Sequence, residues 1–153
     1  MARAARLLKD RGVNVDVRLA GVTAQSIEWM DDHDALNCLG TLPMDKMHKE
    51  FESADVFVLP SLSEGQAGVL LEAMASGCPV IASAESGVDF EPGCGITIPL
   101  ADAEALADAI EEVVTNREKR DSLAAGALRQ AEDFCVERWK SRLMEVMQEA
   151  VSS

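Results

Sequence analysis

Short apolar runs alternate with amphipathic stretches along most of the chain. The clearest run covers residues 55–59, Asp-Val-Phe-Val-Leu, and ends at Pro60. A continuous apolar run of this length is typical of a parallel strand that is buried on both faces, and proline ends such a strand. Similar but shorter patterns predict further strands over residues 13–20, 35–39, 79–82 and 93–99.

Helices are predicted between these strands, where apolar residues recur every three or four positions. Asp102 is a preferred N-cap residue, and the apolar positions from Leu106 to Val114 follow it at helical spacing. Strands that alternate with helices indicate βαβ units, so we expect an α/β fold, a Rossmann-like parallel sheet flanked by helices, in a single domain over residues 1–153. The predicted helices cover residues 2–9, 46–53, 68–76, 102–114, 117–134 and 137–150, with a weak helix or loop over 23–34.

The composition excludes several classes of partner. With 14 Lys and Arg against 27 Asp and Glu, the net charge is −13. Such a surface repels phosphate backbones and anionic lipids, so we expect no nucleic-acid partner. No apolar run approaches the roughly 20 residues of a spanning helix, so we expect no direct membrane insertion. The four cysteines are widely spaced and form no CxxC pair, which favours a cytoplasmic setting over a zinc site or a disulfide framework.

The segment over residues 60–77 carries the most specific chemistry. It joins the clearest strand to an apolar helix through a loop that contains Gly65 and Gly68. Ligands bind at the carboxyl ends of parallel strands, and the free amides of a helix N-terminus favour an anion. Glu72 lies on a helix that should be buried nearly all round, where a carboxylate is unfavourable unless donors meet it. Its side chain leans toward the helix N-terminus, so Glu64 and Glu72 could converge on a sugar-bearing ligand.

Simpler interpretations remain for these and other polar residues. Glu64 could neutralise the helix dipole, which contributes about 0.3 to 1 kcal/mol, and Glu72 could be satisfied by backbone groups or a structural arginine. The run Asp-Asp-His-Asp over residues 31–34 is expected to be a solvated loop, because four adjacent side chains do not easily converge on one metal ion. His48 and the five carboxylates between residues 102 and 112 are expected on the solvated surface.

Several of these segments together resemble a known family. Residues 54–61, Glu64-Gly65, residues 71–75, Gly77 and residues 79–82 resemble the C-terminal, donor-binding domain of the GT-B glycosyltransferases of family 4. That family has two glutamates with seven residues between them, and Glu64 and Glu72 keep this interval. The resemblance extends through almost the whole chain. It implies the C-terminal half of a GT-B fold that lacks the family's first strand and its phosphate loop, because the chain starts within the following helix.

The resemblance also implies roles for individual residues. Glu64 would contact the hexose hydroxyls near the reacting carbon and assist the transfer, and Glu72 would hold the nucleotide ribose. Backbone amides after Gly65 would meet the sugar and the diphosphate, and residues 41–46 lie where relatives place the base. The implied donor-binding residues are Gly65, Gln66, Ala67, Gly68, Val69, Glu72, Thr41 and Lys46, with Glu64 as the catalytic residue and with no metal or cofactor.

Enzymes of this family transfer a hexose from a nucleotide-diphosphate sugar to a glycan or lipid-type acceptor with retention of configuration. The acceptor-binding N-terminal GT-B domain is absent from this chain, so we expect the chain to form one wall of the active site of a longer parent enzyme. The alternative is a non-catalytic module that binds nucleotide sugars or pairs with a separate partner. A phospho-receiver domain is disfavoured, because Pro60-Ser61 stands where its phosphoacceptor aspartate should end the central strand.

Overall fold

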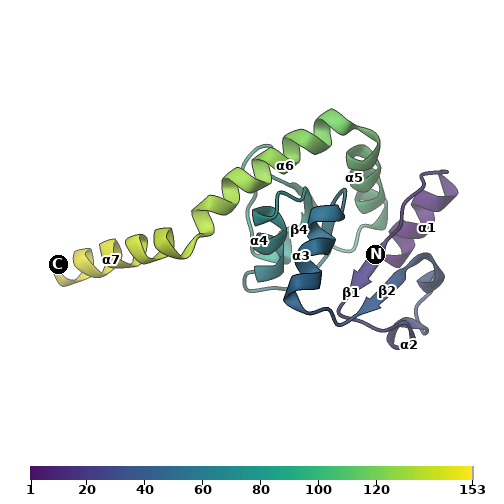
Figure 1. Ribbon diagram of the computed structural model, residues 1–153, viewed down its shortest axis with the longest axis horizontal. Helices are drawn as coiled ribbons and strands as arrows, with labels where there is room; N and C mark the ends of the chain where they lie inside the picture. Colours follow the sequence, from purple (N-terminus) through teal and green to yellow (C-terminus); the bar gives the residue numbers. More distant parts are fainter. Residues whose placement is uncertain (153) are drawn as a thin grey trace.

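The computed structural model describes residues 1–152, with side chains through residue 150, and has an α/β architecture (Figure 1). Its strands form two parallel sheets. In the first sheet, β1 (Arg18–Ala20) pairs with β2 (Asn37–Gly40), and in the second, β4 (Val80–Ser83) lies between β3 (Phe57–Leu59) and β5 (Ile96–Ile98). All pairings are parallel, so the predicted fold class is confirmed, although the strands of the described residues divide into two sheets.

Helices follow most of the strands, largely where the sequence predicts them. Asp102 caps α5 as predicted, since its Oδ1 accepts a hydrogen bond from the Ala105 amide at 2.9 Å. The helices are α1 (Ala2–Asp10), α2 (Ala24–Ile27), α3 (Met44–Ser53), α4 (Gly68–Ala75), α5 (Ala103–Thr115), α6 (Arg117–Ala131) and α7 (Val136–Ser152), with short 3-10 turns at His33–Ala35, Ala84–Ser86 and Glu132–Phe134.

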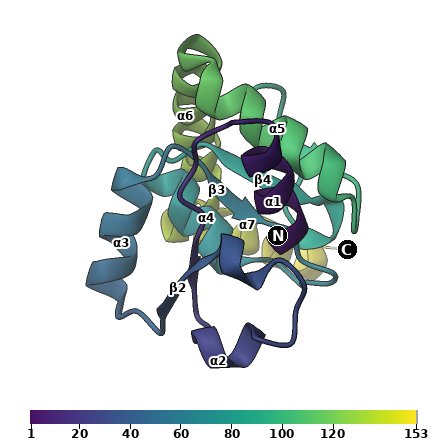
Figure 2. The same ribbon diagram turned by 90° about the vertical axis from the view of Figure 1, so that its right-hand side faces the viewer.

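The core lies on both faces of β4, whose four residues are all buried. Ile81 points into one cluster with Leu8 of α1 and Leu106 of α5, whereas Val80 and Ala82 belong to a second cluster with residues of α3, α4 and α6. This alternation is the two-residue period of a strand. Figure 2 shows the result, with α1 and α3 on opposite sides of the second sheet.

The burial predicted for residues 55–59 is wrong. All three residues of β3 are partly exposed, because β3 pairs on one side with β4 and lies at the edge of its sheet within the described residues. The strand predicted over residues 13–20 is also shorter, since regular pairing begins at Arg18, although Val13 and Val15 still pack against the core.

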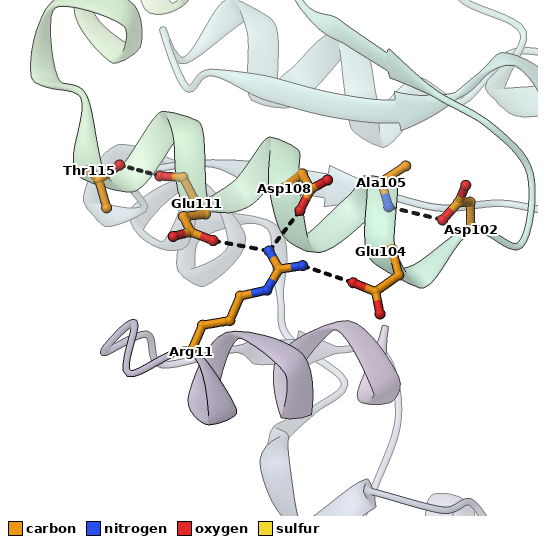
Figure 3. Close-up of polar contacts among 7 residues, drawn as sticks. All are labelled: Arg11, Asp102, Glu104, Ala105, Asp108, Glu111 and Thr115. Carbon is orange, nitrogen blue, oxygen red and sulfur yellow. Dashed lines mark hydrogen bonds and ion pairs between the residues drawn. The ribbon is translucent and has the colours of Figure 1, made fainter.

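Arginine side chains form ion pairs with the acidic residues around α1. Arg11 contacts three carboxylates of α5, from Glu104 at 2.8 Å, Asp108 at 2.7 Å and Glu111 at 3.0 Å (Figure 3). These three carboxylates lie on the exposed side of α5, as expected, and they share one arginine there. Arg6 binds both Asp32 and Asp34, and this guanidinium lowers the pKa of Asp34.

The last helix, α7, extends away from the body of the molecule (Figure 1). Its predicted apolar positions are exposed, including Trp139, Leu143 and Met147. Across the residues that the structure describes, no helix has both the length and the apolar character that crossing a membrane requires.

Candidate functional site

The candidate site is the loop over residues 60–67, called here the Glu64 loop, which joins the carboxyl end of β3 to the start of α4. Residues 83–87, which comprise the last residue of the neighbouring strand β4 and the four residues after it, lie against it. The Glu64 amide donates to the Glu85 carbonyl at 2.9 Å, and the Ala67 amide donates to the Ser86 carbonyl at 3.1 Å. Because β3 and β4 are parallel, their carboxyl ends meet at the edge where α/β proteins bind ligands.

Glu64 is exposed, and its carboxylate accepts a hydrogen bond from the Ser61 hydroxyl at 3.1 Å. Helix α4 begins only at Gly68, with Ala67 as its N-cap, and has no acidic residue in its first turn. The helix dipole acts mainly within the first turn. The structure therefore gives little support to the interpretation that Glu64 only neutralises this dipole.

Glu72 lies in the second turn of α4 and is partly exposed. The prediction that α4 is buried nearly all round is wrong, because only Leu70, Ala73 and Met74 are buried while Ala75 is exposed. These buried residues belong to the core cluster with residues of α3, α6 and the second sheet, and Val69 and Leu71 are partly buried against it. Among the described residues, neither an arginine nor a backbone amide contacts the Glu72 carboxylate, so its acceptor oxygens remain available.

The start of α4 presents free backbone donors. The Gly68 and Val69 amides have no acceptor within the described chain, as expected for the first turn of a helix, and the Gln66 amide has none either. Ala67 differs, because it is buried and its amide already donates to Ser86. The Ala67 amide therefore has no free hydrogen for a ligand, contrary to what the family resemblance implies.

Thr41 and Lys46 lie on neighbouring structure but are not joined to the Glu64 loop. Thr41 follows β2 of the first sheet, and Lys46 lies in the first turn of α3; both are exposed. Helix α3 contacts α4, and its Phe51 is buried in the core cluster that contains residues of α4. Within the described residues, no hydrogen bond or ion pair connects either of them to the loop.

Sequence reasoning missed the contribution of residues 83–87. Ser83 is buried, and its hydroxyl donates to the Ser61 carbonyl at 2.6 Å. One carboxylate oxygen of Glu85 and the hydroxyl of Ser86 are buried without a hydrogen-bond partner. One sequence signal could have revealed this segment. It is polar and comes at the end of a buried strand, β4, which lies next to the strand that leads into the Glu64 loop.

No metal centre is apparent in the described part of the chain, where no three His, Cys, Asp or Glu side chains gather closely enough to hold an ion. The acidic run over residues 31–34 is instead occupied by Arg6 and Arg3. His48 is exposed, and its ring meets that of Phe51 edge-on with the ring centres 6.4 Å apart.

Comparison with known proteins identifies the family. Residues 1–116 match the family described as glycosyl transferases group 1. The sulfoquinovosyl transferase of Arabidopsis thaliana is 31% identical over 120 residues, which cover 74% of this chain and 23% of that protein. The chain thus spans about a quarter of the length of this curated relative.

Solved structures show the same fold. Sucrose-phosphate synthase from Thermosynechococcus elongatus superposes with a TM-score of 0.78 at 22% identity, over 99% of this chain and 42% of the other. HepE of Anabaena, solved in complex with UDP-glucose, superposes with a TM-score of 0.69 at 16% identity, over 97% of this chain and 53% of the other. The chain has the α/β architecture of a GT-B glycosyltransferase domain and belongs to the glycosyl transferases group 1 family.

Proposed function

We propose that residues 1–153 form the donor-binding domain of a retaining glycosyltransferase, which transfers a hexose from a nucleotide-diphosphate sugar to a glycan or lipid-type acceptor. One observation carries the proposal. Two carboxylates without a basic partner, those of Glu64 and Glu72, lie before and within α4, whose first amides at Gly68 and Val69 are free. This combination offers acceptors for sugar hydroxyls beside donors for a diphosphate.

Each group has a distinct role in this proposal. Glu64 accepts from the hexose hydroxyls near the reacting carbon and stabilises the charge that develops there during transfer. Glu72 accepts from the two ribose hydroxyls. The amides of Gln66, Gly68 and Val69 donate to the diphosphate at the positive end of the α4 dipole. Gly65 lets the ligand approach the backbone closely, and Thr41 and Lys46 border the base.

Backbone donors also suit the strongly acidic composition. The chain carries a net charge of −13, yet the proposed donor is itself an anion. Amides receive phosphate oxygens without any basic side chain, so we propose that neither a metal ion nor another cofactor is required. The free cysteines of the described chain fit a cytoplasmic location, which we propose as well.

The proposed acceptor site lies outside this chain. Because the chain covers 23% of the length of its plant relative and 42% of the cyanobacterial one, we propose that an acceptor-binding domain supplies the other wall of the active site. One structural neighbour was solved with UDP-glucose, which makes this nucleotide sugar a suitable first probe.

Isothermal titration of the chain with UDP-glucose tests donor binding. We expect the wild type to bind, and Glu64→Gln and Glu72→Gln to weaken the affinity by about tenfold each, since each variant loses hydrogen bonds to a charged acceptor. Glu28→Gln is the matched control, because Glu28 is exposed at the end of α2 and has the same charge. Equal affinities for all four proteins would contradict the proposed roles of the two glutamates.

A non-catalytic module that only binds nucleotide sugars is the second candidate. It is favoured by one observation: within the described residues, no lysine or arginine makes a hydrogen bond or ion pair with residues 60–67. Transfer assays on a polypeptide that joins this chain to an acceptor-binding domain separate the two functions. If the joined polypeptide is a transferase, we expect Glu64→Ala and Glu72→Ala each to abolish most turnover. Near-wild-type turnover in both variants would refute the catalytic function.

A further inference from the structure

Gly87 lies in contact with the backbone of the Glu64 loop. Its φ of +72° is in the left-handed region, and a Cβ atom at this position would be 2.3 Å from the Gly65 carbonyl oxygen and 3.1 Å from the Cα of Gln66. Real Cβ atoms do not approach backbone atoms so closely. Glycine is therefore required here for two reasons, its conformation and the space available.

Hydrogen bonds fix the same two segments along their length. The amides of Glu64 and Ala67 donate to the carbonyls of Glu85 and Ser86, and the Ser83 hydroxyl donates to the Ser61 carbonyl at 2.6 Å. The contact is thus made by backbone groups and one serine hydroxyl. Consistent with this close packing, the Ser86 hydroxyl is buried but has no partner of its own.

We propose that residues 83–87 act as a brace that sets the position of the Glu64 loop, and that Gly87 and Ser83 are positioning residues for donor binding. This inference rests on the proposed function. The brace holds the backbone from Ser61 to Ala67, so the free amides of Gln66 and Gly68 and the carboxylate of Glu64 are oriented before a ligand arrives. Preorganised donors bind more tightly than donors that must first be ordered.

Substitution of two glycines with nearly equal φ distinguishes the effect of the brace from the effect of backbone strain alone. Gly77, which follows α4, has a φ of +71°, almost equal to that of Gly87, but a Cβ there would meet nothing within 4 Å. Gly77→Ala and Gly87→Ala therefore introduce the same left-handed alanine. Only Gly87→Ala introduces a collision with Gly65.

Two readouts on the ¹⁵N-labelled chain test the proposal, namely the amide spectrum without ligand and the affinity for UDP-glucose. We expect Gly87→Ala to shift the amide resonances of Gly65, Gln66 and Ala67 and to weaken UDP-glucose binding by at least about tenfold relative to Gly77→Ala. Loop resonances or an affinity that match those of Gly77→Ala would overturn the proposal.

The outcome also distinguishes this inference from the proposed function. A wild-type chain that binds none of the uridine, guanosine and adenosine diphosphate sugars overturns the donor-binding function and the brace's role in it. A wild-type chain that binds, together with a Gly87→Ala variant of equal affinity, overturns only the brace.

A second pair of variants keeps the test decisive if Gly87→Ala does not fold. Ser83 and Ser86 are both buried, but only the Ser83 hydroxyl bonds to the Glu64 loop. We expect Ser83→Ala to shift the Ser61 to Gly65 resonances and to weaken UDP-glucose binding, whereas Ser86→Ala, which keeps its backbone carbonyl, does neither. Equal effects of the two substitutions would overturn the proposal.

Discussion

Partly buried carboxylates in this chain generally hold a cationic partner. Asp32 pairs with Arg6, Glu50 with Arg18 and Glu111 with Arg11. Glu72 and Glu85 are also partly buried, but no cation pairs with either of them among the described residues. An unpaired carboxylate in such a place keeps its acceptor capacity for a ligand. The environment of Glu72 thus agrees with its proposed contact to ribose hydroxyls.

The cysteines differ sharply in environment, which predicts their reactivity. Burial raises the pKa of the Cys78 thiol from about 9.0 to about 11, and Cys94 is also buried, whereas Cys135 is exposed. Because the thiolate is the reactive form, we expect a thiol reagent at about pH 8 to label Cys135 first and Cys78 only after unfolding. Peptide mapping by mass spectrometry checks the order, and rapid labelling of Cys78 in the native chain would contradict its burial.

The raised pKa of Cys78 also predicts a pH dependence of stability. The folded state disfavours the thiolate, so the contribution of the neutral thiol is complete below about pH 9 and is lost as the pH rises toward 11. We expect the stability advantage of the wild type over Cys78→Ala to shrink by up to about 2 to 3 kcal/mol across this range. Urea unfolding at several pH values measures it, and a difference independent of pH would refute the prediction.

At the scale of elements, local sequence patterns predicted the helices, whereas contacts between residues far apart in the sequence could not be predicted. The predicted helix over residues 68–76 corresponds to α4 at Gly68–Ala75, and Asp102 caps α5 as expected. The exposure of β3 could not be foreseen, since burial on both faces depends on which strands lie beside it. The contact between Arg11 and α5 likewise joins residues more than 90 positions apart.

The Arg11 cluster predicts how α1 is held on α5. Arg11→Met leaves Glu104, Asp108 and Glu111 without their shared cation, so we expect a lower melting temperature at low salt and a smaller deficit at high salt, where charges are screened. Arg117→Met is the control, because Arg117 is exposed and pairs with Asp121 alone on the same helix. Equal melting temperatures for the two variants at low salt would contradict this role.

For the whole molecule, the proposed binding of an anionic donor must be compatible with a net charge of −13. Several arginines are engaged by carboxylates around α1, as Arg6 and Arg11 show, so the excess negative charge is not offset by a basic patch there. The Glu64 loop lies apart from this network and offers backbone amides instead. The spacing of Glu64 and Glu72 predicted this candidate site from the sequence. The brace from residues 83–87 did not show in the sequence, because close approach of two backbones leaves no pattern of residue types.

Mapping the amide shifts of the ¹⁵N-labelled chain during titration with UDP-glucose tests the central claim most directly. Donor binding at the start of α4 predicts saturable shifts that are largest at Gln66, Gly68 and Val69, because these amides have no acceptor in the free chain. Ala67, whose amide is held by Ser86, should move less. Shifts centred on another part of the chain, or no saturable shifts with any of the uridine, guanosine and adenosine diphosphate sugars, would contradict the assignment of this site.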